Sequence, residues 1–190
     1  KAKNVKCVVV TTGEEKVLRA LNEVVSRLEE LGLDYVILSS KPLNYRSVIV
    51  IPPERDGSKY RAIRYFAEEY ARDDYWYVFF DDDSYPEDDD FLYGIAYFSG
   101  KDPRYAVGNG FIKPRPGKSR LAYALDWARY FYDLTNYRFA AILKRPIYGL
   151  HGELLIVRGD VLRDVWPKMA ESITEDFNFA MHIMKRGYWF

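Results

Sequence analysis

The sequence predicts an α/β fold with a mixed, mostly parallel sheet flanked by helices. Two observations support this fold class: apolar runs of strand length alternate with segments of helical periodicity, and the apolar runs are typical of strands buried on both faces. The chain has 190 residues, which is enough for a sizeable core. We therefore expect one domain over residues 1–190.

The first half of the chain alternates strands and helices regularly. We expect strands at residues 5–11, 35–38, 47–51 and 76–80, and helices after the first strand and over about 58–72. Thr12 and Glu15 fit a capping box at the start of the first helix. Apolar residues follow a 3.6-residue period in this helix, at Val17, Leu18, Leu21, Val24, Val25, Leu28 and Leu31. The second helix is expected to bury Ala62, Ile63, Phe66, Ala67 and Tyr70.

The second half is less regular and looks like a substrate-facing layer. We expect helices at residues 91–98, 121–134, 160–166 and 172–186, with strands at 105–112 and 154–157. Residues 113–120 form a basic, proline-bearing loop. A solvated loop is the simple interpretation, while an acceptor lid or a membrane-surface contact are the functional ones.

Three consecutive acids, Asp81, Asp82 and Asp83, follow the fourth buried strand. Ligands of open α/β sheets bind in the crevice beyond the carboxyl ends of the strands. Asp81 and Asp83 can point the same way if the chain is still extended there. Such a pair can hold a hard divalent cation and leave its other positions to water and phosphates. An acidic turn that merely ends a strand is the alternative interpretation.

Two helix starts in the first half could meet an anionic ligand. The segment Thr11, Thr12, Gly13 and Glu14 offers backbone N–H groups to a nucleotide or another anion, although a simple cap explains it equally well. Residues 55–62 include Asp56 and place Lys59 and Arg61 in the first turns of the second helix. Basic residues there oppose the helix dipole, which favours a role in binding a phosphate or a sugar-diphosphate.

Glu175 and Asp176 lie in the first turn of the last expected helix. Ser172 and Glu175 fit a capping box, and the helix dipole stabilises acids at this position. This structural interpretation explains Glu175 better than Asp176, and a carboxylate here could serve as a general base. His151 lies in a glycine-flanked turn, where a ligand contact and a structural hydrogen bond are equally good interpretations.

Composition and missing motifs exclude several classes of protein. Basic and acidic residues both number 28, so the net charge is zero and a general nucleic-acid binder is disfavoured. The single cysteine, Cys7, cannot form a disulfide within the chain. The sequence has no GxxxxGK[ST] phosphate loop, no nucleophile elbow and no Cys/His cluster. These absences disfavour common nucleotide hydrolases, serine hydrolases and zinc proteins with cysteine ligands.

No apolar segment approaches the roughly 20 residues of a membrane-spanning helix. We therefore expect a soluble or peripheral chain, in the cytoplasm or at the cytoplasmic face of a membrane. The chain stops at residue 190 inside an apparent strand. We expect further chain there, with membrane association through segments beyond residue 190 left open.

In their order along the chain, these segments resemble family 2 glycosyltransferases with the GT-A fold. Residues 9–13 resemble the nucleotide-contacting turn, and residues 57–62 resemble the glycine-lysine segment. The acids at 81–83 resemble the DxD motif, and residues 174–176 resemble the ED motif that carries the catalytic base. Residues 59–62, 151–153 and 172–179 are most similar to egghead-type and archaeal GDP-mannose-dependent β-mannosyltransferases.

The resemblance implies inverting transfer of a sugar, mannose in particular, from GDP-mannose to a glycan or lipid-linked acceptor. Residues 1–100 would form the nucleotide-binding half, and 101–190 the acceptor and catalytic half. The implied cofactor is Mn²⁺ or Mg²⁺, bound by Asp83 with Asp81 or His151 as further candidate ligands. Asp176, beside Glu175, would be the base. The implied donor contacts are Thr11, Thr12, Gly13, Glu14, Asp56, Lys59, Arg61, Asp81 and Asp82.

The triple acid departs from the usual DxD pattern, because Asp82 leaves open which two acids face the site. Two other functions remain as alternatives. A nucleotidyltransferase would usually carry a glycine-rich basic segment after the first strand, and Glu14, Glu15 and Lys16 match this poorly. A non-catalytic sugar-binding module would show no dependence on a metal.

Overall fold

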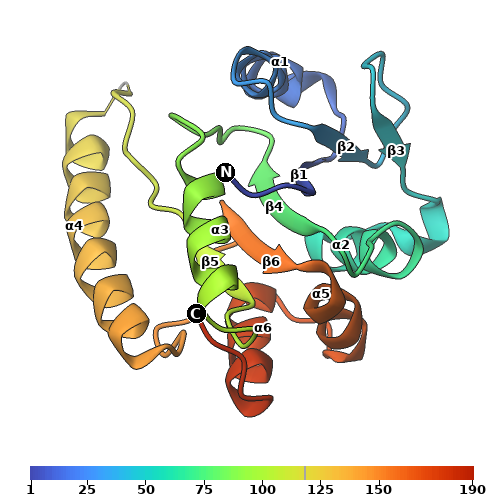
Figure 1. Cartoon of the computed structure of the whole chain (residues 1–190). Helices are drawn as coiled ribbons and strands as arrows, with labels where there is room; N and C mark the ends of the chain where they lie inside the picture. Colours follow the sequence, from blue (N-terminus) through green and yellow to red (C-terminus); the bar gives the residue numbers. More distant parts are fainter. Residues whose placement is uncertain (118) are drawn as a thin grey trace.

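The computed structural model describes residues 1–117 and 119–190, and its centre is a six-stranded sheet of order β3-β2-β1-β4-β6-β5 (Figure 1). The sheet confirms the expected mixed α/β architecture. Its strands are β1 (Val5–Thr11), β2 (Tyr35–Ser39), β3 (Val48–Val50), β4 (Trp76–Asp81), β5 (Val107–Asn109) and β6 (Leu155–Arg158).

Strand directions explain which parts of the chain meet at one edge of the sheet. Strands β1 to β4 are mutually parallel, whereas β6 is antiparallel to both β4 and β5. The carboxyl ends of β1 and β4, at Thr11 and Asp81, therefore lie at the same edge as the amino end of β6. This arrangement brings residues 151–154, which precede β6, to the acidic end of β4.

Helices cover both faces of the sheet because successive strand residues point to opposite sides. Val8 and Phe79 pack with α2 (Lys59–Glu69), α5 (Gly159–Val165) and α6 (Glu175–Lys185). Val9 and Phe80 pack on the other face with α1 (Glu15–Glu30) and α3 (Phe91–Lys101). Short 3₁₀ turns at Pro53–Arg55 and Trp166–Lys168 complete the described elements.

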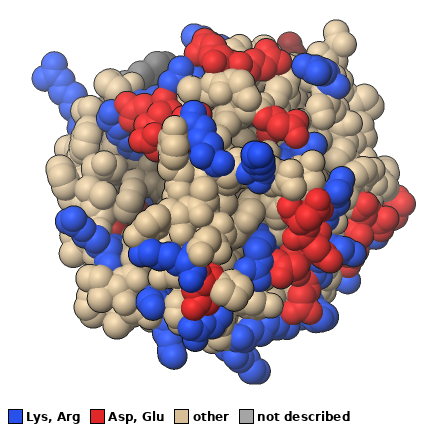
Figure 2. Space-filling view, viewed as in Figure 1, with Lys and Arg blue, Asp and Glu red and all other residues tan. Residues whose placement is uncertain are grey.

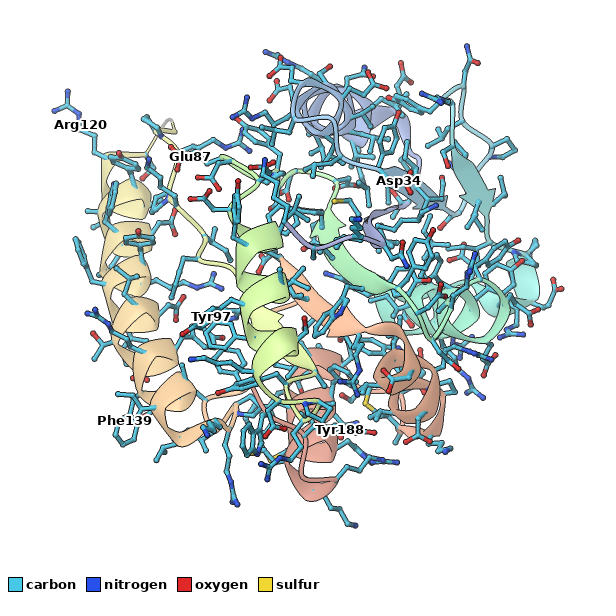
Figure 3. All side chains as sticks on the ribbon, viewed as in Figure 1. Asp34, Glu87, Tyr97, Arg120, Phe139 and Tyr188 are labelled. Carbon is cyan, nitrogen blue, oxygen red and sulfur yellow. The ribbon has the colours of Figure 1, made fainter. Side chains whose placement is uncertain are left out.

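Helix α4 (Arg120–Leu143) lies at one side of the molecule, beyond α3 (Figure 1). It is longer than the helix expected at 121–134. The helix continues to Leu143 and ends at Lys144, whose backbone has a left-handed conformation. Tyr137 and Ala140 are buried, whereas Phe139 points away from α3 (Figure 3). Only one side of α4 therefore packs on the domain.

Several local expectations were wrong. Helix α1 begins after Glu14 and has no side-chain cap, so Thr12 and Glu15 form no capping box; the Thr12 hydroxyl instead accepts from the Glu14 N–H at 3.4 Å. The cap of α6 is Thr174, again without a side-chain bond, and the buried Ser172 hydroxyl has no partner among the described residues.

Strand β5 and helix α2 are shorter than expected. Strand β5 covers three residues rather than 105–112, because only residues 107–109 pair with β6, whereas Tyr105 forms an isolated bridge with Trp189. Tyr70 is 45% exposed because α2 ends before it. Among the residues that the structure describes, no helix has both the length and the apolar character to cross a membrane.

Candidate active site

The three acids after β4 have three different surroundings. The Asp81 carboxylate accepts a hydrogen bond from the Lys59 ammonium group. The Asp82 carboxylate accepts one from the Thr11 hydroxyl at 2.6 Å. Asp83 is exposed, and its carboxylate accepts only from the neighbouring Ser84 hydroxyl, at 3.3 Å, among the described residues. The chain therefore leaves Asp83 as the most accessible of the three carboxylates.

Asp82 has a structural role in the turn after β1. Burial raises the pKa of the Asp82 carboxyl, while the Thr11 hydrogen bond opposes this and the neighbouring acids add to it. The Thr11 hydroxyl also accepts from the Gly13 N–H at 3.1 Å. Gly13 has a φ of +66°, and a Cβ atom there would lie 2.6 Å from the Ser39 hydroxyl. Thr11 thus links this tight turn to the acidic end of β4.

Lys59 brings α2 to the acids. Ser58 caps the helix by accepting from the Arg61 N–H at 3.2 Å, so Lys59 occupies the first helical position. Its positive charge opposes the helix dipole, and pairing with Asp81 compensates for this. The Lys59 ammonium also lies close to Gly152, where a Cβ atom would be only 2.7 Å away. Residue 152 therefore has to be small for Lys59 to reach Asp81.

Asp176 is held at the start of α6 by two backbone groups. One carboxylate oxygen accepts from the Gly152 N–H at 3.1 Å, and the other accepts from the Phe177 N–H at 2.8 Å. Glu175 beside it has a raised pKa, caused chiefly by burial, with Asp176 and Asp81 adding to the rise and Lys59 opposing it. The ED pair and the acidic end of β4 therefore belong to one electrostatic cluster.

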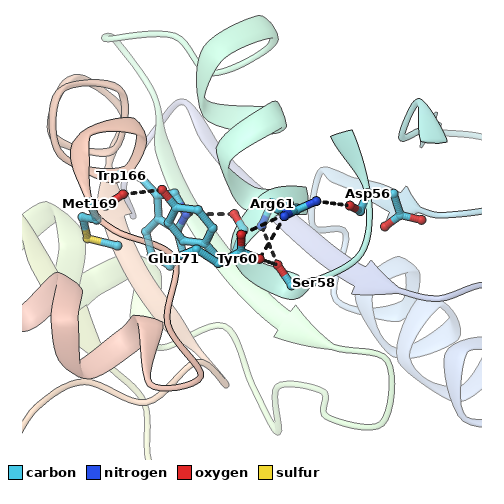
Figure 4. Close-up of polar contacts among 7 residues, drawn as sticks. All are labelled: Asp56, Ser58, Tyr60, Arg61, Trp166, Met169 and Glu171. Atoms are coloured by element: carbon cyan, nitrogen blue, oxygen red, sulfur yellow. Dashed lines mark hydrogen bonds and ion pairs between the residues drawn. The ribbon is translucent and has the colours of Figure 1, made fainter. Parts of the chain in front are cut away.

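Arg61 points away from this cluster to a different partner. Its guanidinium binds the Glu171 carboxylate at 3.0 and 3.1 Å, and the Ser58 hydroxyl donates to the same carboxylate at 2.7 Å (Figure 4). The Arg61 guanidinium also reaches the Asp56 carbonyl at 3.4 Å. In this structure, Arg61 and Asp56 therefore tie the start of α2 to the segment before α6. That Arg61 and Asp56 contact a nucleotide-sugar donor remains a prediction.

The contacts of His151 run to α4. Its Nε2 atom is buried without a hydrogen-bond partner among the described residues and lies 3.4 Å from an Asp133 carboxylate oxygen. Its ring meets the Tyr137 ring edge-on, with centroids 5.4 Å apart. The Asn109 amide clamps the His151 backbone, donating to its carbonyl at 2.9 Å and accepting from its N–H at 3.0 Å. A metal-binding role for His151 remains a prediction.

Sequence reasoning missed Asp133, Tyr137, Asn109 and Glu171. A signal existed for two of them. Asp133 is an acid on the inner side of an aromatic-rich helix, and it is only 8% exposed. Asn109 is a polar residue between two glycines in a strand. Burial and the charges of Asp133 and Asp176 raise the pKa of the Tyr137 hydroxyl. Glu171 had no distinctive signal.

A groove of about 1150 Å³ opens beside the acids, between α1, the 111–115 segment and α4. Asp83, Glu153 and Arg129 line it. Arg115 closes part of one side by donating to the Asp83 carbonyl at 2.7 Å. The groove is large enough for an extended ligand beside the exposed Asp83 carboxylate.

The chain's own donor set fits a metal that is shared with a substrate. Among the described residues, no group of three or more His, Cys, Asp or Glu side chains is placed to hold an ion. Mg²⁺ is typically bound through one or two carboxylates plus substrate phosphates. The exposed Asp83 carboxylate can supply such a ligand, whereas Asp81 is paired with Lys59 and Asp82 with Thr11.

Two comparisons with known proteins gave matches. A family model described as glycosyl transferase family group 2 matches residues 76–190. The mannosyltransferase PcManGT from Pyrobaculum calidifontis, solved in complex with GDP-Man and Mn²⁺, is structurally similar with a TM-score of 0.68 at 17% sequence identity. The match covers 100% of this chain and 54% of that one, so the chain spans about half the length of that relative. A search of curated proteins found no match.

The structural likeness shows that the fold is GT-A. The family match runs from the start of β4 through the acids and the ED pair to the last residue, so it contains most of the candidate site. On this basis the chain belongs to glycosyl transferase family group 2.

Proposed function

We propose that the protein is an inverting mannosyltransferase that uses GDP-mannose and Mn²⁺ or Mg²⁺. The observation that carries this proposal is the convergence of α2 and α6 on Gly152: its N–H donates to the Asp176 carboxylate, and the ammonium group of Lys59, which pairs with Asp81, lies close to it. Family membership supports sugar transfer, and the similar mannosyltransferase was solved with GDP-Man and Mn²⁺.

In the proposed mechanism, Asp176 is the general base. Its carboxylate is oriented by the Gly152 and Phe177 N–H groups, so it can accept the proton of an acceptor hydroxyl without first having to reorient. An inverting transfer needs this base on the side of the sugar opposite the leaving diphosphate. The acceptor would be a glycan or a lipid-linked sugar or alcohol.

Asp83 would hold the cation, with Asp81 the second candidate and His151 the third. The cation neutralises charge on the leaving diphosphate when bound. Lys59, already beside the acids, would contribute a second positive charge to the diphosphate. The turn at Thr11, Thr12, Gly13 and Glu14 would contact the nucleotide, supported through Asp82. These assignments rest on the geometry of the edge shared by β1 and β4.

The test is turnover of GDP-mannose with Mn²⁺ or Mg²⁺ and a panel of soluble and lipid-linked acceptors. Thermal shift with GDP, UDP and CDP, each with and without Mn²⁺, identifies the nucleotide, because a ligand selective for the folded state raises the melting temperature. We expect GDP with Mn²⁺ to give the largest shift and Asp83→Ala to remove the metal-dependent part.

Asp176→Asn separates binding from chemistry. We expect it to keep the GDP shift and to lose transfer by roughly 10²- to 10⁴-fold, the usual contribution of a general base. Full activity of Asp176→Asn would overturn the base assignment. Preference for a nucleoside triphosphate with release of pyrophosphate would instead identify a nucleotidyltransferase.

A further inference from the structure

A second hollow, of about 630 Å³, lies between α3 and α4. We call it the α3–α4 pocket. Its walls are mainly apolar and come from both helices: Phe91, Ile95 and Phe98 on α3, and Tyr130, Tyr137 and Ala141 on α4. Its volume lies in the range of about 300–1,000 Å³ that is typical of small-molecule sites.

Glycines line part of this pocket. Gly94 on α3 and Gly108 on β5 both line it and place no side chain inside. A Cβ atom at Gly94 would meet nothing within 4 Å, so this position leaves room for a larger side chain.

The α3–α4 pocket borders the groove beside Asp83. Five residues line both, namely Pro86, Glu87, Phe111, Lys113 and Leu154. Tyr137 and Asn109 form part of the pocket wall and also contact the ring and the backbone of His151, which precedes Gly152. One molecule could therefore occupy the apolar pocket and the polar groove at once.

The surface around this region is suited to an apolar ligand. In the view of Figure 2, the side of the molecule formed by α4 is mostly uncharged, whereas acids and bases gather above it and on the opposite side. Phe98 at the pocket is 44% exposed, and Phe111 at the boundary with the groove is 43% exposed. Exposed aromatic residues around a concave apolar site are typical of ligand-binding grooves.

We propose that the α3–α4 pocket binds the apolar chain of a lipid-linked acceptor, whose polar head extends along the groove towards Asp83. The identification of this ligand as the acceptor rests on the proposed function. An apolar pocket that borders a polar groove matches the two parts of a single amphiphile, whereas a partner helix would match the apolar pocket alone. Free glycans would use only the groove.

The pocket can be tested without any donor. The probe is N-phenyl-1-naphthylamine, an uncharged dye that fluoresces in apolar sites, displaced by hexyl, octyl and decyl glucoside below their micelle concentrations. We expect one saturable dye site and displacement that strengthens with chain length, by up to roughly fourfold per methylene group. Displacement that does not depend on chain length would overturn the proposal.

Two glycines of α3 provide a matched pair of variants. Gly94→Leu fills the pocket, whereas Gly100→Leu adds the same side chain to the same helix outside it, and neither Cβ atom meets an obstacle within 4 Å. We expect dye affinity to fall at least tenfold in Gly94→Leu and to stay unchanged in Gly100→Leu. Equal affinity in both variants would overturn the proposal.

A second pair covers the case in which Gly94→Leu does not fold. Ala141→Phe adds a large side chain to the pocket wall on α4, and Ala124→Phe is its control on the same helix outside the pocket. Dimerisation that pocket-filling variants abolish would assign the pocket to a second copy of the chain and overturn the proposal. GDP and Mn²⁺ binding, measured in the same variants, shows separately whether the proposed transferase function holds.

Discussion

The ammonium group of Lys59, at the first position of α2, pairs with the carboxylate of Asp81 at the last position of β4. The pair is partly screened from water, with side chains that are 25% and 32% exposed. The pair joins the start of α2 to the end of β4. The start of α2 would attract the diphosphate, and the end of β4 would hold the metal. The free protein thus keeps one positive and one negative group in contact at the proposed donor site.

Replacing Lys59 by Met removes this charge and leaves Asp81 without its partner. We expect GDP affinity in the presence of Mn²⁺ to fall by roughly 10- to 150-fold, corresponding to the ~1.5–3 kcal/mol of a hydrogen bond to a charged group. Isothermal titration calorimetry measures the affinity. Lys168→Met is the control, because it removes another lysine–aspartate pair, with Asp164, on the separate 3₁₀ turn. An equal loss in both variants would contradict a specific role for Lys59.

Gly152 tests whether the close approach of Lys59 and Asp176 matters for turnover. A Cβ atom at this position would lie 2.7 Å from the lysine nitrogen and 3.9 Å from an Asp176 carboxylate oxygen. Gly152→Ala should therefore displace Lys59 and lower kcat, while the melting temperature changes little because the lysine side chain can move. Gly117→Ala, where a Cβ atom meets nothing within 4 Å, is the control. A wild-type kcat for Gly152→Ala would show that the contact is dispensable.

The sequence predicted the sheet well because its strands are continuous apolar runs, such as the one that ends at Asp81. The first residues of the helices were less predictable. The Thr12 and Ser172 capping boxes fit the spacing rule, but the backbone enters each helix two residues later. Only the fold decides where a helix starts when several residues can cap it.

Contacts between residues far apart in the sequence could not be predicted either. Lys59 and Asp176 were each recognisable as candidates, but their meeting at Gly152 depends on the antiparallel direction of β6, which no local pattern indicates. Asp133 was missed because α4 was expected to end at residue 134, which placed this acid at a fraying helix end. In the structure it lies well inside a helix that continues to Leu143, on the buried side.

The Arg61–Glu171 pair provides a test between a tether and a donor contact. We expect Arg61→Gln and Glu171→Gln to lower the melting temperature slightly and by similar amounts, since exposed ion pairs contribute little, and neither should weaken GDP binding. Added salt should reduce both effects. Weaker GDP binding in Arg61→Gln alone would show instead that Arg61 leaves Glu171 to bind the donor.

Gly159 is predicted to be the least replaceable glycine for stability. A Cβ atom there would lie 1.9 Å from the Arg72 carbonyl oxygen and 3.0 Å from the Tyr75 carbonyl oxygen, both of which belong to the backbone. Gly159→Ala forces the start of α5 away from this turn and should cost about 1–3 kcal/mol or more of unfolding free energy. Urea denaturation measures this cost, with Gly100→Ala as the unobstructed control. Equal midpoints would contradict the close packing described.

Glu175 makes the stability of the free protein depend on pH in a defined direction. Burial raises the pKa of its carboxyl above the ordinary value of 4.5, so the folded state holds the proton to higher pH than the unfolded state does. Its favourable contribution is complete below the unfolded pKa and is lost as pH rises through the folded pKa. Glu175→Gln never ionises, so this variant should melt at a higher temperature than wild type at about pH 7. The difference should disappear near pH 4.

Glu171 supplies a control of opposite sign. Hydrogen bonds from Ser58 and Arg61 lower the pKa of its carboxyl, so its contribution is present above the unfolded pKa and is lost as pH falls through the folded one. Glu171→Gln should therefore melt below wild type at neutral pH. Differential scanning calorimetry of both variants between about pH 4 and about pH 7, without nucleotide or metal, measures how each melting temperature changes with pH. A lower melting temperature for Glu175→Gln than for wild type at neutral pH would show that the Glu175 carboxylate is stabilised by its neighbours rather than strained by burial.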